Sequence, residues 1–504
     1  MVKLYELLKK VPSIIQIPTH KALNKKVEGI STNSHSCKQE EIFIGMPGTR
    51  VDGGEFWQSA IKAGAVAAVI SPQAAIKFPA NDLYCVIIVE DVILTASEIA
   101  AAFYSYPSKK LKMIGVTGTN GKTTTTHLIE YFLTECQKDT ALIGTLYSRW
   151  NGFKQTSVHT TPFSPELQAQ LSQAVIDKNQ YCVMEVSSHA LIQGRVKGCN
   201  FDVSIFTNLT QDHLDFHKNL ENYFFAKQLL FSSEYLQGKA IINIDDPYGE
   251  RLIQGLDSQL IYSYSIENNL ADFYTTNLKY KHDRVEGVLQ TPIGSYEFQS
   301  PLVGKFNLSN LLAAIATLFQ LNINLEIAIE KLPYFLGVPG RMEKIQISKV
   351  QDVTVIVDYA HTPDSLKNLL KATRPFVSGK IISVFGCGGD RDRTKRPVMG
   401  KISAELADIS VLTSDNPRTE EPEQILSDIL KGVPQCTNFW VISNRNEAIR
   451  TAILKANPGD GILIAGKGHE NYQILGTEKI YFDDREQARE SLRVRLEGPH
   501  DLSN

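Results

Sequence analysis

Short apolar runs separated by polar and turn-forming segments divide the chain into three parts. In residues 1–108 the clearest runs are 65–70 and 85–90, and this part ends near the turn-like sequence at 106–108. Short apolar runs bounded by turn residues are typical of buried strands. We therefore predict a small N-terminal α/β domain over residues 1–108.

The next two parts alternate strand-like runs with amphipathic, helix-like segments. In residues 109–338 the runs are KMIGV, TALIGT, YCVMEVSS, FDVSIFTN and AIINID. In residues 339–504 they are VTVIVD, KIISVF, DISVLT, FWVIS and GILIAG. Such alternation is typical of mainly parallel sheets with crossover helices. We predict a central α/β domain over 109–338 and a doubly wound, Rossmann-like domain over 339–504, with ligand sites in the loops at the carboxyl ends of the strands.

Length and composition fit this division. A chain of 504 residues exceeds the roughly 250–300 residues that one hydrophobic core supports. With 52 basic and 55 acidic residues the net charge is -3, so we expect no nucleic-acid partner. The seven cysteines include no C-x-x-C pair, and no apolar run reaches the ~20 residues needed to cross a bilayer. We expect a monomeric, cytoplasmic protein that does not insert into membranes.

A glycine-rich loop follows the run 112–116 and leads into the helix-like sequence HLIEYFLTE. Glycines let backbone N–H groups face a phosphate, a lysine neutralises its charge, and a hydroxyl ligates Mg²⁺. Val116 stands where the strict G-x-x-x-x-G-K-[ST] pattern has its first glycine, so this is a shortened variant. We predict an ATP site, with a threonine-capped glycine turn as the alternative; its residues are Gly118, Thr119, Asn120, Gly121, Lys122, Thr123 and Thr124.

Glu185 is the candidate carboxylate for Mg²⁺ beside Lys122 and Thr123. It ends the apolar run YCVME and precedes the polar sequence VSSH. A carboxylate at the end of a buried strand is unfavourable unless it is paired or bound to a metal ion. The alternative is a surface salt bridge at a strand end.

An ordered series of motifs resembles the Mur ligases of peptidoglycan precursor synthesis. The series consists of IGVTGTNGKTTT, HTTP, MEVSSHAL, TNLTQDHLDFH, FNLSN and VDYAHTPDSL, and the resemblance extends from Asn33 to Glu470. The resemblance implies three domains, for the UDP end of the substrate, for ATP and for the incoming amino acid. Folylpolyglutamate synthetases share the ATPase core and are the nearest confusable relatives. The implied cofactors are ATP and Mg²⁺, and the implied partners are small-molecule substrates.

By this resemblance the metal site comprises Thr123, Glu185, His213 and a carbamylated Lys227. Carbamylation turns the Lys227 cation into an anionic oxygen ligand, and the catalytic set becomes Lys122, Glu185, His213 and Lys227. From the residues alone, Lys227 is a snorkelling surface lysine. Likewise Asp212 caps a helix and the histidines of DHLDFH are solvated.

The family also implies nucleotide contacts from Asn307, Asn310, Arg341 and Asp358, with Asp358 near the ribose. Asn307 and Asn310 lie three residues apart, on one face at the start of a predicted helix. A helix-capping role for Asn307 is the alternative. Arg341 and Asp358 are far in sequence from Lys122, so a working site requires domain closure.

The segment TSDNPRTEEP resembles the signature of the family members that add meso-diaminopimelate. A planar guanidinium at Arg418 suits the second carboxylate of that amino acid, whereas lysine would present an ammonium there. Without the resemblance, DNPR is a turn before a helix start. The diaminopimelate contacts implied are Arg391, Asp415, Asn416, Pro417, Arg418, Gly466 and Glu470.

The same resemblance assigns the UDP-N-acetylmuramoyl-L-alanyl-D-glutamate site, with Arg195 suited to a carboxylate of the dipeptide. The sequence departs from the family at Asn33-Ser34-His35, at Asp52-Gly53-Gly54 and at Phe163. The implied contacts are Ser34, Thr160, Thr161, Ser187 and Arg195.

The implied reaction makes an amide in two steps. A substrate carboxylate attacks the γ-phosphate of ATP, and an amine then displaces phosphate from the acyl phosphate. Positioning and charge neutralisation supply most of the catalysis in phosphoryl transfer, so no Ser/His/Asp triad is needed. Two alternatives stay open: a lysine-adding or other Mur ligase, and a nucleotide-binding regulator without catalytic activity.

Overall fold

The computed structural model describes residues 2–48, 51–281, 284–435 and 437–497. The chain forms two compact units made of interleaved segments. The first comprises residues 1–117, 137–205 and 226–240, and the second comprises 118–136, 206–225 and 241–504. The domain boundaries expected at residues 108 and 338 stay predictions.

The N-terminal part contains a four-stranded parallel sheet, and the predicted runs 65–70 and 85–90 contain two of its strands. Its order is β3 (Gly29–Ser31), β4 (Glu41–Ile44), β5 (Ala67–Ile70) and β6 (Val86–Ile88). Side chains of β4 alternate between two apolar clusters, because successive strand residues face opposite sides. One cluster includes α1 (Leu4–Leu8) and α4 (Val92–Phe103), and the other includes α2 (Trp57–Ala63) and α3 (Pro72–Lys77).

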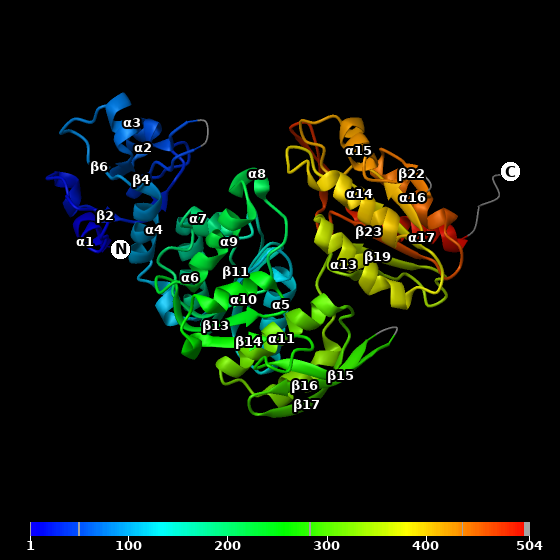
Figure 1. Ribbon diagram of the computed structural model, residues 1–504. Helices are drawn as coiled ribbons and strands as arrows, with labels where there is room; N and C mark the ends of the chain where they lie inside the picture. Colours follow the sequence, from blue (N-terminus) through cyan, green and yellow to red (C-terminus); the bar gives the residue numbers. More distant parts are fainter. Residues whose placement is uncertain (1, 49–50, 282–283, 436, 498–504) are drawn as a thin grey trace. The chain divides into compact units, whose positions relative to one another are not determined.

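The next sheet has eight strands in the order β10-β9-β8-β11-β7-β12-β13-β14. Figure 1 labels β11, β13 and β14 of this sheet. Strands β7, β8 and β11 run parallel, and β9 and β10 add an antiparallel edge. All five predicted runs are strands. The bounds are β7 Lys112–Thr117, β8 Thr140–Ile143, β9 Tyr147–Trp150, β10 Phe153–Thr156, β11 Tyr181–Glu185, β12 Phe201–Phe206, β13 Leu236–Asn243 and β14 Ile261–Tyr264.

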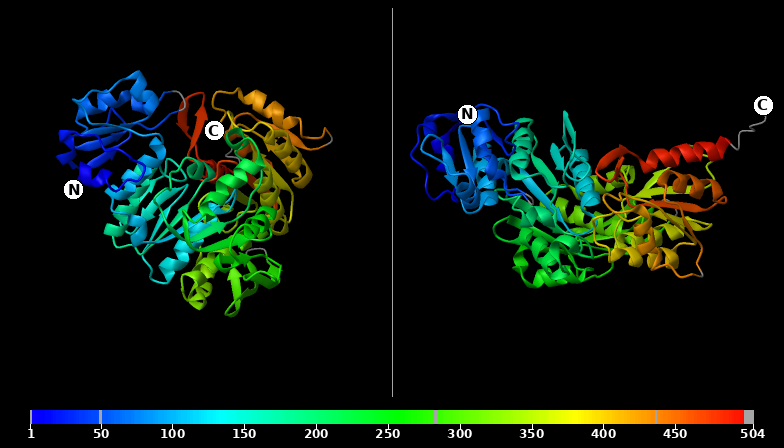
Figure 2. Two further views of the ribbon diagram at one scale, coloured as in Figure 1. Left: turned by 60° about the vertical axis from the view of Figure 1, so that its left-hand side comes forward. Right: turned by 90° about the horizontal axis from the view of Figure 1, so that it is seen from above.

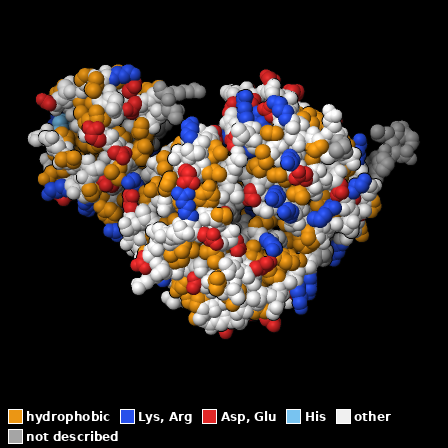
Figure 3. All heavy atoms as spheres, viewed as in Figure 1, with side chains coloured by type: hydrophobic (Ala, Val, Ile, Leu, Met, Phe, Trp, Pro, Cys, Tyr) orange, Lys and Arg blue, Asp and Glu red, His pale blue; other side chains and the backbone are white. Residues whose placement is uncertain are grey.

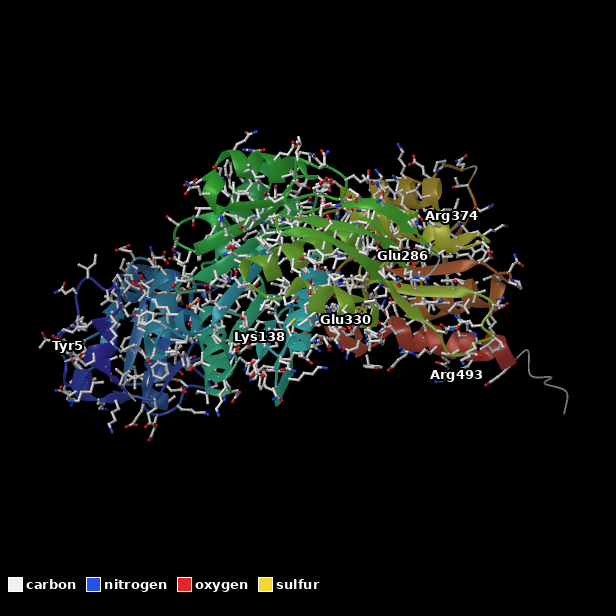
Figure 4. The ribbon with its side chains drawn as sticks, turned by 90° about the horizontal axis from the view of Figure 1, so that it is seen from below. Tyr5, Lys138, Glu286, Glu330, Arg374 and Arg493 are labelled. Atoms are coloured by element: carbon white, nitrogen blue, oxygen red, sulfur yellow. The ribbon has the colours of Figure 1, made fainter. Side chains whose placement is uncertain are left out.

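Helix α5 (Lys122–Glu135) follows the glycine-rich loop and packs against α11 (Lys305–Gln320). Near them lies an antiparallel sheet that the sequence analysis does not anticipate. It consists of β15 (Tyr274–Tyr280), β16 (Val285–Thr291) and β17 (Gly294–Ser300), and α12 (Leu325–Lys331) packs on β17. Figure 4 labels Glu286 on β16 and Glu330 on α12, which line the same surface groove.

The C-terminal sheet has the order β18-β19-β23-β20-β21-β22. All of its pairings are parallel except that of the edge strand β18. Apolar clusters cover both faces, which confirms the doubly wound, Rossmann-like arrangement. The bounds are β18 Glu343–Ile345, β19 Thr354–Asp358, β20 Ile381–Phe385, β21 Ile409–Leu412, β22 Phe439–Val441 and β23 Gly461–Ala465.

Helices complete this C-terminal part. Figure 2 shows α17 (Asp484–Glu497) along one side of the sheet, where it packs against α16 (Arg445–Lys455). After β23 the chain forms a hairpin of β24 (Tyr472–Leu475) and β25 (Glu478–Tyr481). The other helices here are α13 Pro363–Thr373, α14 Lys395–Leu406 and α15 Pro422–Leu430.

The charged side chains on the surface and the cysteines give general information about the protein rather than about one site. On the face drawn in Figure 3, basic and acidic side chains are interspersed. Within the described residues, no helix is both long enough and apolar enough to span a membrane. Six cysteines are free thiols, and Cys436 lies outside the described residues.

Candidate active site

Two glycines shape the predicted phosphate loop because no other residue fits their backbone. Gly118 has φ 149° and Gly121 has φ 89°, both in the region that favours glycine. A Cβ on Gly118 would lie 1.8 Å from Thr207 Oγ1, and one on Gly121 would lie 2.4 Å from Asn310 Oδ1. The loop therefore packs tightly against two polar side chains from elsewhere in the second unit.

The loop ends where α5 begins, and a helix N-terminus is suited to binding a phosphate. Lys122 folds back over the loop, and its Nζ donates to the carbonyls of Gly118 and Thr119 at 2.9 Å each. Asn120 N–H donates to Asn208 Oδ1 at 2.9 Å. The glycine turn that was the alternative to an ATP site is present, and the first residue of the helix after it is Lys122.

Asn310 connects the loop to α11. Thr125 Oγ1 donates to Asn310 Oδ1 at 3.3 Å, and Asn310 Nδ2 donates to Asn307 Oδ1 at 3.3 Å. Asn307 lies inside α11 rather than at its N-cap, which is Gly304, so the capping alternative is wrong. Both asparagines are buried beside the loop, and their contact with nucleotide stays a prediction.

Arg341 and Asp358 lie together in the second unit. Arg341 Nη2 donates to Thr123 Oγ1 at 3.1 Å, and its guanidinium stacks over the Tyr359 ring. Asp358 Oδ2 accepts a hydrogen bond from Met342 N–H at 2.7 Å. Burial raises the pKa of Asp358, and the nearby Arg341 opposes that shift. Arg341 is thus distant in sequence from the phosphate loop but contacts the hydroxyl of Thr123 at its end.

Glu185, in the first unit, ends β11 and is fully buried at 0% exposure. Its Oε1 accepts from Thr145 N–H at 2.8 Å and its Oε2 from Thr145 Oγ1 at 2.9 Å. A Cβ on Gly144 would lie 2.5 Å from Oε1, so only glycine leaves room for this carboxylate. The surface salt bridge considered as its alternative is therefore wrong.

The residues predicted to bind the UDP-linked dipeptide gather around Glu185. Thr161 Oγ1 donates to the Glu185 carbonyl at 2.8 Å and accepts from Ser187 N–H at 3.1 Å. Arg195 Nη1 donates to the Thr161 carbonyl at 2.9 Å, while its guanidinium stacks 4.0 Å from the Phe163 ring centre. Thr160 Oγ1 lies 3.2 Å from Thr145 Oγ1. Phe163, a departure from the family pattern, thus supports Arg195.

Ser34 is the exception within this predicted set. It is buried in the turn that follows β3, away in sequence from the other four. The preceding Asn33 accepts a hydrogen bond from His35 N–H at 2.9 Å, which forms a local turn. Its contact with the uridine end stays a prediction.

Lys227 and His213 belong to different units. Lys227 on α9 (Leu220–Gln228) is 1% exposed, so the snorkelling alternative is wrong. His213 Nε2 lies 3.3 Å from Asp212 Oδ2, and Asp212 also faces His361. His213 is the N-cap of α8 (Leu214–His217), so Asp212 does not cap that helix, and His217 is buried rather than solvated. Carbamylation of Lys227 stays a prediction.

The predicted amino-acid contacts gather at the carboxyl ends of β20, β21 and β23. A Cβ on Gly388 would lie 2.9 Å from Arg418 Nη1 and 3.6 Å from Arg391 Cγ, so the arginines flank this glycine. Burial, and next the charge of Arg391, lower the pKa of Arg418. Two guanidiniums held close together are suited to an anion.

Arg418 is held by the β24–β25 hairpin rather than by a helix. Its N–H donates to the Ile474 carbonyl at 3.1 Å, and Gly476 N–H donates to the Arg418 carbonyl at 2.8 Å. Arg418 has φ 54°, a strained conformation that such contacts maintain. Helix α15 begins at Pro422, four residues after Arg418, and Arg418 itself pairs with the hairpin.

Asn416 joins Glu470 to the same segment. Asn416 Nδ2 donates to Glu470 Oε2 at 3.0 Å, and Gln473 Nε2 donates to the Asp415 carbonyl at 2.6 Å. A Cβ on Gly466 would lie 2.6 Å from Asp415 Oδ2. A Cβ on Gly389 would lie 1.8 Å from the Pro417 carbonyl oxygen, so both glycine-rich turns touch the DNPR segment.

The residues missed from the sequence are mostly neighbours of those predicted. Thr145 and Gly144 directly follow β8, and Lys467 lies within GKGHE. Their position at strand ends was a usable signal. Gln473 and Arg445 carried no such signal, because a hairpin and a helix bring them to the site.

Comparison with known proteins agrees with this geometry. Residues 26–106 match the Mur ligase family, catalytic domain; residues 116–318 match the Mur ligase middle domain; and residues 340–468 match the Mur ligase, glutamate ligase domain. A UDP-N-acetylmuramoyl-L-alanyl-D-glutamate--2,6-diaminopimelate ligase of Nostoc sp. is 60% identical over 98% of this chain and 99% of its own length. One of Synechocystis sp. is 58% identical over 98% and 100%.

Solved structures are similar along nearly the whole chain. A structure of a UDP-N-acetylmuramoyl-L-alanyl-D-glutamate--2,6-diaminopimelate ligase has a TM-score of 0.68 at 33% identity, covering 98% of this chain and 99% of that chain. MurF from Acinetobacter baumannii has a TM-score of 0.67 at 20% identity with the same coverage, which indicates a shared fold. From these identities over nearly its full length, we conclude that the chain belongs to the Mur ligase family.

Proposed function

We propose that the chain is an ATP-dependent ligase of peptidoglycan precursor synthesis. It joins meso-2,6-diaminopimelate to the glutamate carboxylate of UDP-N-acetylmuramoyl-L-alanyl-D-glutamate. The relatives that are 58% and 60% identical carry the name of this activity. The structural observation that supports it best is the pairing of Arg391 with Arg418 beside the Asn416–Glu470 hydrogen bond.

The charges of this site match a diaminopimelate. Arg391 and Arg418 offer two guanidiniums to a carboxylate, and Glu470 offers an acceptor to an ammonium. The far end of diaminopimelate carries a carboxylate as well as an ammonium, whereas the far end of lysine carries only an ammonium. Bound lysine would therefore leave Arg418 without a carboxylate partner. A partly buried cation left without a counter-ion disfavours binding of the wrong amine, which gives specificity by exclusion.

ATP is the energy source of the proposed reaction. The substrate carboxylate attacks the γ-phosphorus, the bond to the β–γ bridging oxygen breaks, and ADP leaves. The neutral amine of diaminopimelate then attacks the acyl carbon, phosphate leaves, and the nitrogen loses a proton. Lys122 and the N-terminus of α5 hold the phosphates in line, with Arg341 beside Thr123 as a further positive charge.

Mg²⁺ is the metal ion that the family resemblance implies. The Thr123 hydroxyl and the Glu185 carboxylate are hard oxygen ligands, and the narrow space at Gly144 keeps the Glu185 carboxylate in one position. These two residues, with His213 and a carbamylated Lys227, would hold the ion. When bound, Mg²⁺ neutralises charge on the phosphates.

We place the reaction in the cytoplasm and expect a monomer. The buried free thiols Cys182, Cys199 and Cys387 fit a reducing compartment. Cell fractionation together with sedimentation of the purified protein tests both statements.

Amide formation is the direct test. Purified protein is given ATP, Mg²⁺ and the UDP-linked dipeptide with meso-diaminopimelate, with lysine or with no amine, and the product is identified by mass. We expect a tripeptide product with diaminopimelate alone. Preference for lysine would identify a lysine-adding ligase, and absence of any amide would favour a non-catalytic nucleotide-binding regulator.

A further inference from the structure

We propose that Lys467 is a positioning residue of the amino-acid site. Its ammonium fixes the Glu470 carboxylate and the Asn416 amide in one arrangement, which then receives the ammonium of the incoming diaminopimelate. This inference rests on the proposed function, because it takes Glu470 as the acceptor for the substrate amine.

Three side chains form a closed triangle. Lys467 Nζ donates to Asn416 Oδ1 at 3.1 Å and to Glu470 Oε2 at 3.1 Å. Asn416 Nδ2 donates to the same Glu470 Oε2 at 3.0 Å. Each member therefore contacts both others, so a displacement of one displaces the carboxylate.

The orientation of the Asn416 amide is determined by its partners. Its Oδ1 accepts from Ile474 N–H at 3.0 Å as well as from Lys467 Nζ. Only the oxygen of an amide can accept from two donors, which leaves Nδ2 directed at Glu470. Lys467 thus helps to decide which Asn416 atom faces the carboxylate.

Burial shows that Lys467 acts through Glu470. The Lys467 side chain is 0% exposed, whereas that of Glu470 is 15% exposed. Lys467 Nζ also lies 5.3 Å from the Tyr472 ring centre, inside the loop. A substrate can therefore contact Glu470 directly. The Lys467 ammonium influences the substrate only through its hydrogen bond to the Glu470 carboxylate.

The loop backbone does not depend on the Lys467 ammonium. Glu470 N–H donates to the Lys467 carbonyl at 2.9 Å, and Gly466 N–H donates to the Asp358 carbonyl at 3.1 Å. These bonds remain when the side chain is shortened or neutralised. Removal of the ammonium should therefore alter the carboxylate more than the fold.

The first test replaces Lys467 by Met, which keeps length and removes charge. We expect the KM for diaminopimelate to rise about tenfold, since a hydrogen bond to a charged group is lost, while the KM for ATP and for the UDP-linked dipeptide changes less than about twofold. Lys479→Met is the matched control, because Lys479 is exposed on β25 and stacks on the Tyr472 ring. An unchanged KM for diaminopimelate in Lys467→Met would overturn the proposal.

A double-mutant cycle with Glu470→Gln separates positioning from a general structural effect. If Lys467 acts through Glu470, Lys467→Met adds less than about twofold to the KM for diaminopimelate in the Glu470→Gln background. Independent, multiplying effects would contradict the inference. Should Lys467→Met fail to fold, Lys467→Arg keeps the cation but displaces its contacts, and the same rise restricted to diaminopimelate is expected.

The wild-type protein separates this inference from the proposed function. A wild type that forms no diaminopimelate amide refutes both. A wild type that forms it, together with a Lys467→Met variant of unchanged KM, refutes the positioning role alone.

Discussion

Arg445 and Asp484 form a fully buried ion pair. Arg445 Nε donates to Asp484 Oδ1 and Nη2 donates to Oδ2, both at 2.7 Å, and both side chains are 0% exposed. The same guanidinium donates to the Ala465 carbonyl at 3.0 Å and to the Ser414 carbonyl at 3.4 Å. Since these carbonyls precede Gly466 and Asp415, the pair connects α16 and α17 to both loops of the amino-acid site.

Asp484→Asn should destabilise the protein strongly, because it leaves the Arg445 charge buried without its counter-ion. A buried pair broken on one side loses about 3–5 kcal/mol of unfolding free energy, measurable by urea denaturation. Asp352→Asn is the control: Asp352 pairs with Arg495 in a half-exposed position and should lose less than about 1 kcal/mol. Equal losses of unfolding free energy in the two variants would show that burial does not make the Arg445–Asp484 pair more stabilising than the Arg495–Asp352 pair.

Arg418→Lys tests the recognition of the second carboxylate. A lysine keeps the charge but not the planar pair of donors, so kcat/KM for diaminopimelate should fall about 10- to 100-fold. ATP affinity should not change. Arg493→Lys on α17, which Figure 4 labels, is an exposed control. Retention of full kcat/KM by Arg418→Lys would mean that Arg418 does not bind the substrate bidentately.

The sequence predicts the strands and the glycine-rich turn after β7 correctly, because both are local features. Apolar runs identify β7 and β11; the predicted phosphate loop directly follows β7, and the candidate metal ligand Glu185 is the last residue of β11. The Rossmann-like class of the C-terminal domain follows from the same alternation of strands and helices. Each of these features can be recognised from the pattern of apolar and polar residues within a single segment.

What the sequence did not reveal depends on pairing between distant segments. Ile474 holds Arg418 through backbone groups, which carry no residue-specific signal. The sequence does not show whether a lysine such as Lys467 is exposed or buried. Its contact with Glu470 is therefore visible only in the structure. The sheet of β15, β16 and β17 is half polar, and its strands lack the continuous apolar runs of a parallel core.

Gly121→Ala should impair ATP use beyond its effect on stability. Its φ of 89° strains any other residue, and the new Cβ would lie 2.4 Å from Asn310 Oδ1. Gly152→Ala is the matched control, because Gly152 has φ 79° with nothing within 4 Å of the new Cβ. Both variants should lose about 1 kcal/mol from strain. Only Gly121→Ala should raise the KM for ATP, and a similar rise in Gly152→Ala would exclude the clash as its cause.

Glu420 supports the loop that carries Arg391 and shows how pH should affect stability. Arg396, which is fully buried, donates to Glu420 Oε2 at 3.0 Å and to Oε1 at 2.8 Å. Asp390 N–H donates to Glu420 Oε1 at 2.6 Å. The hydrogen bond from Arg396 is the main cause that lowers the pKa of Glu420 below its usual 4.5.

A carboxyl group whose pKa is lower in the folded state stabilises the fold when ionised. The contribution of Glu420 is therefore complete above its unfolded pKa of 4.5 and is lost as the pH falls through the lower folded pKa. Glu420→Gln should unfold more easily than the wild type by about 1–3 kcal/mol at neutral pH, and this difference should shrink below about pH 4.5. Urea denaturation from neutral to acidic pH measures it, with the exposed Glu421→Gln as control. A difference that stays constant down to acidic pH would show that the Glu420 carboxylate does not stabilise the fold through its charge.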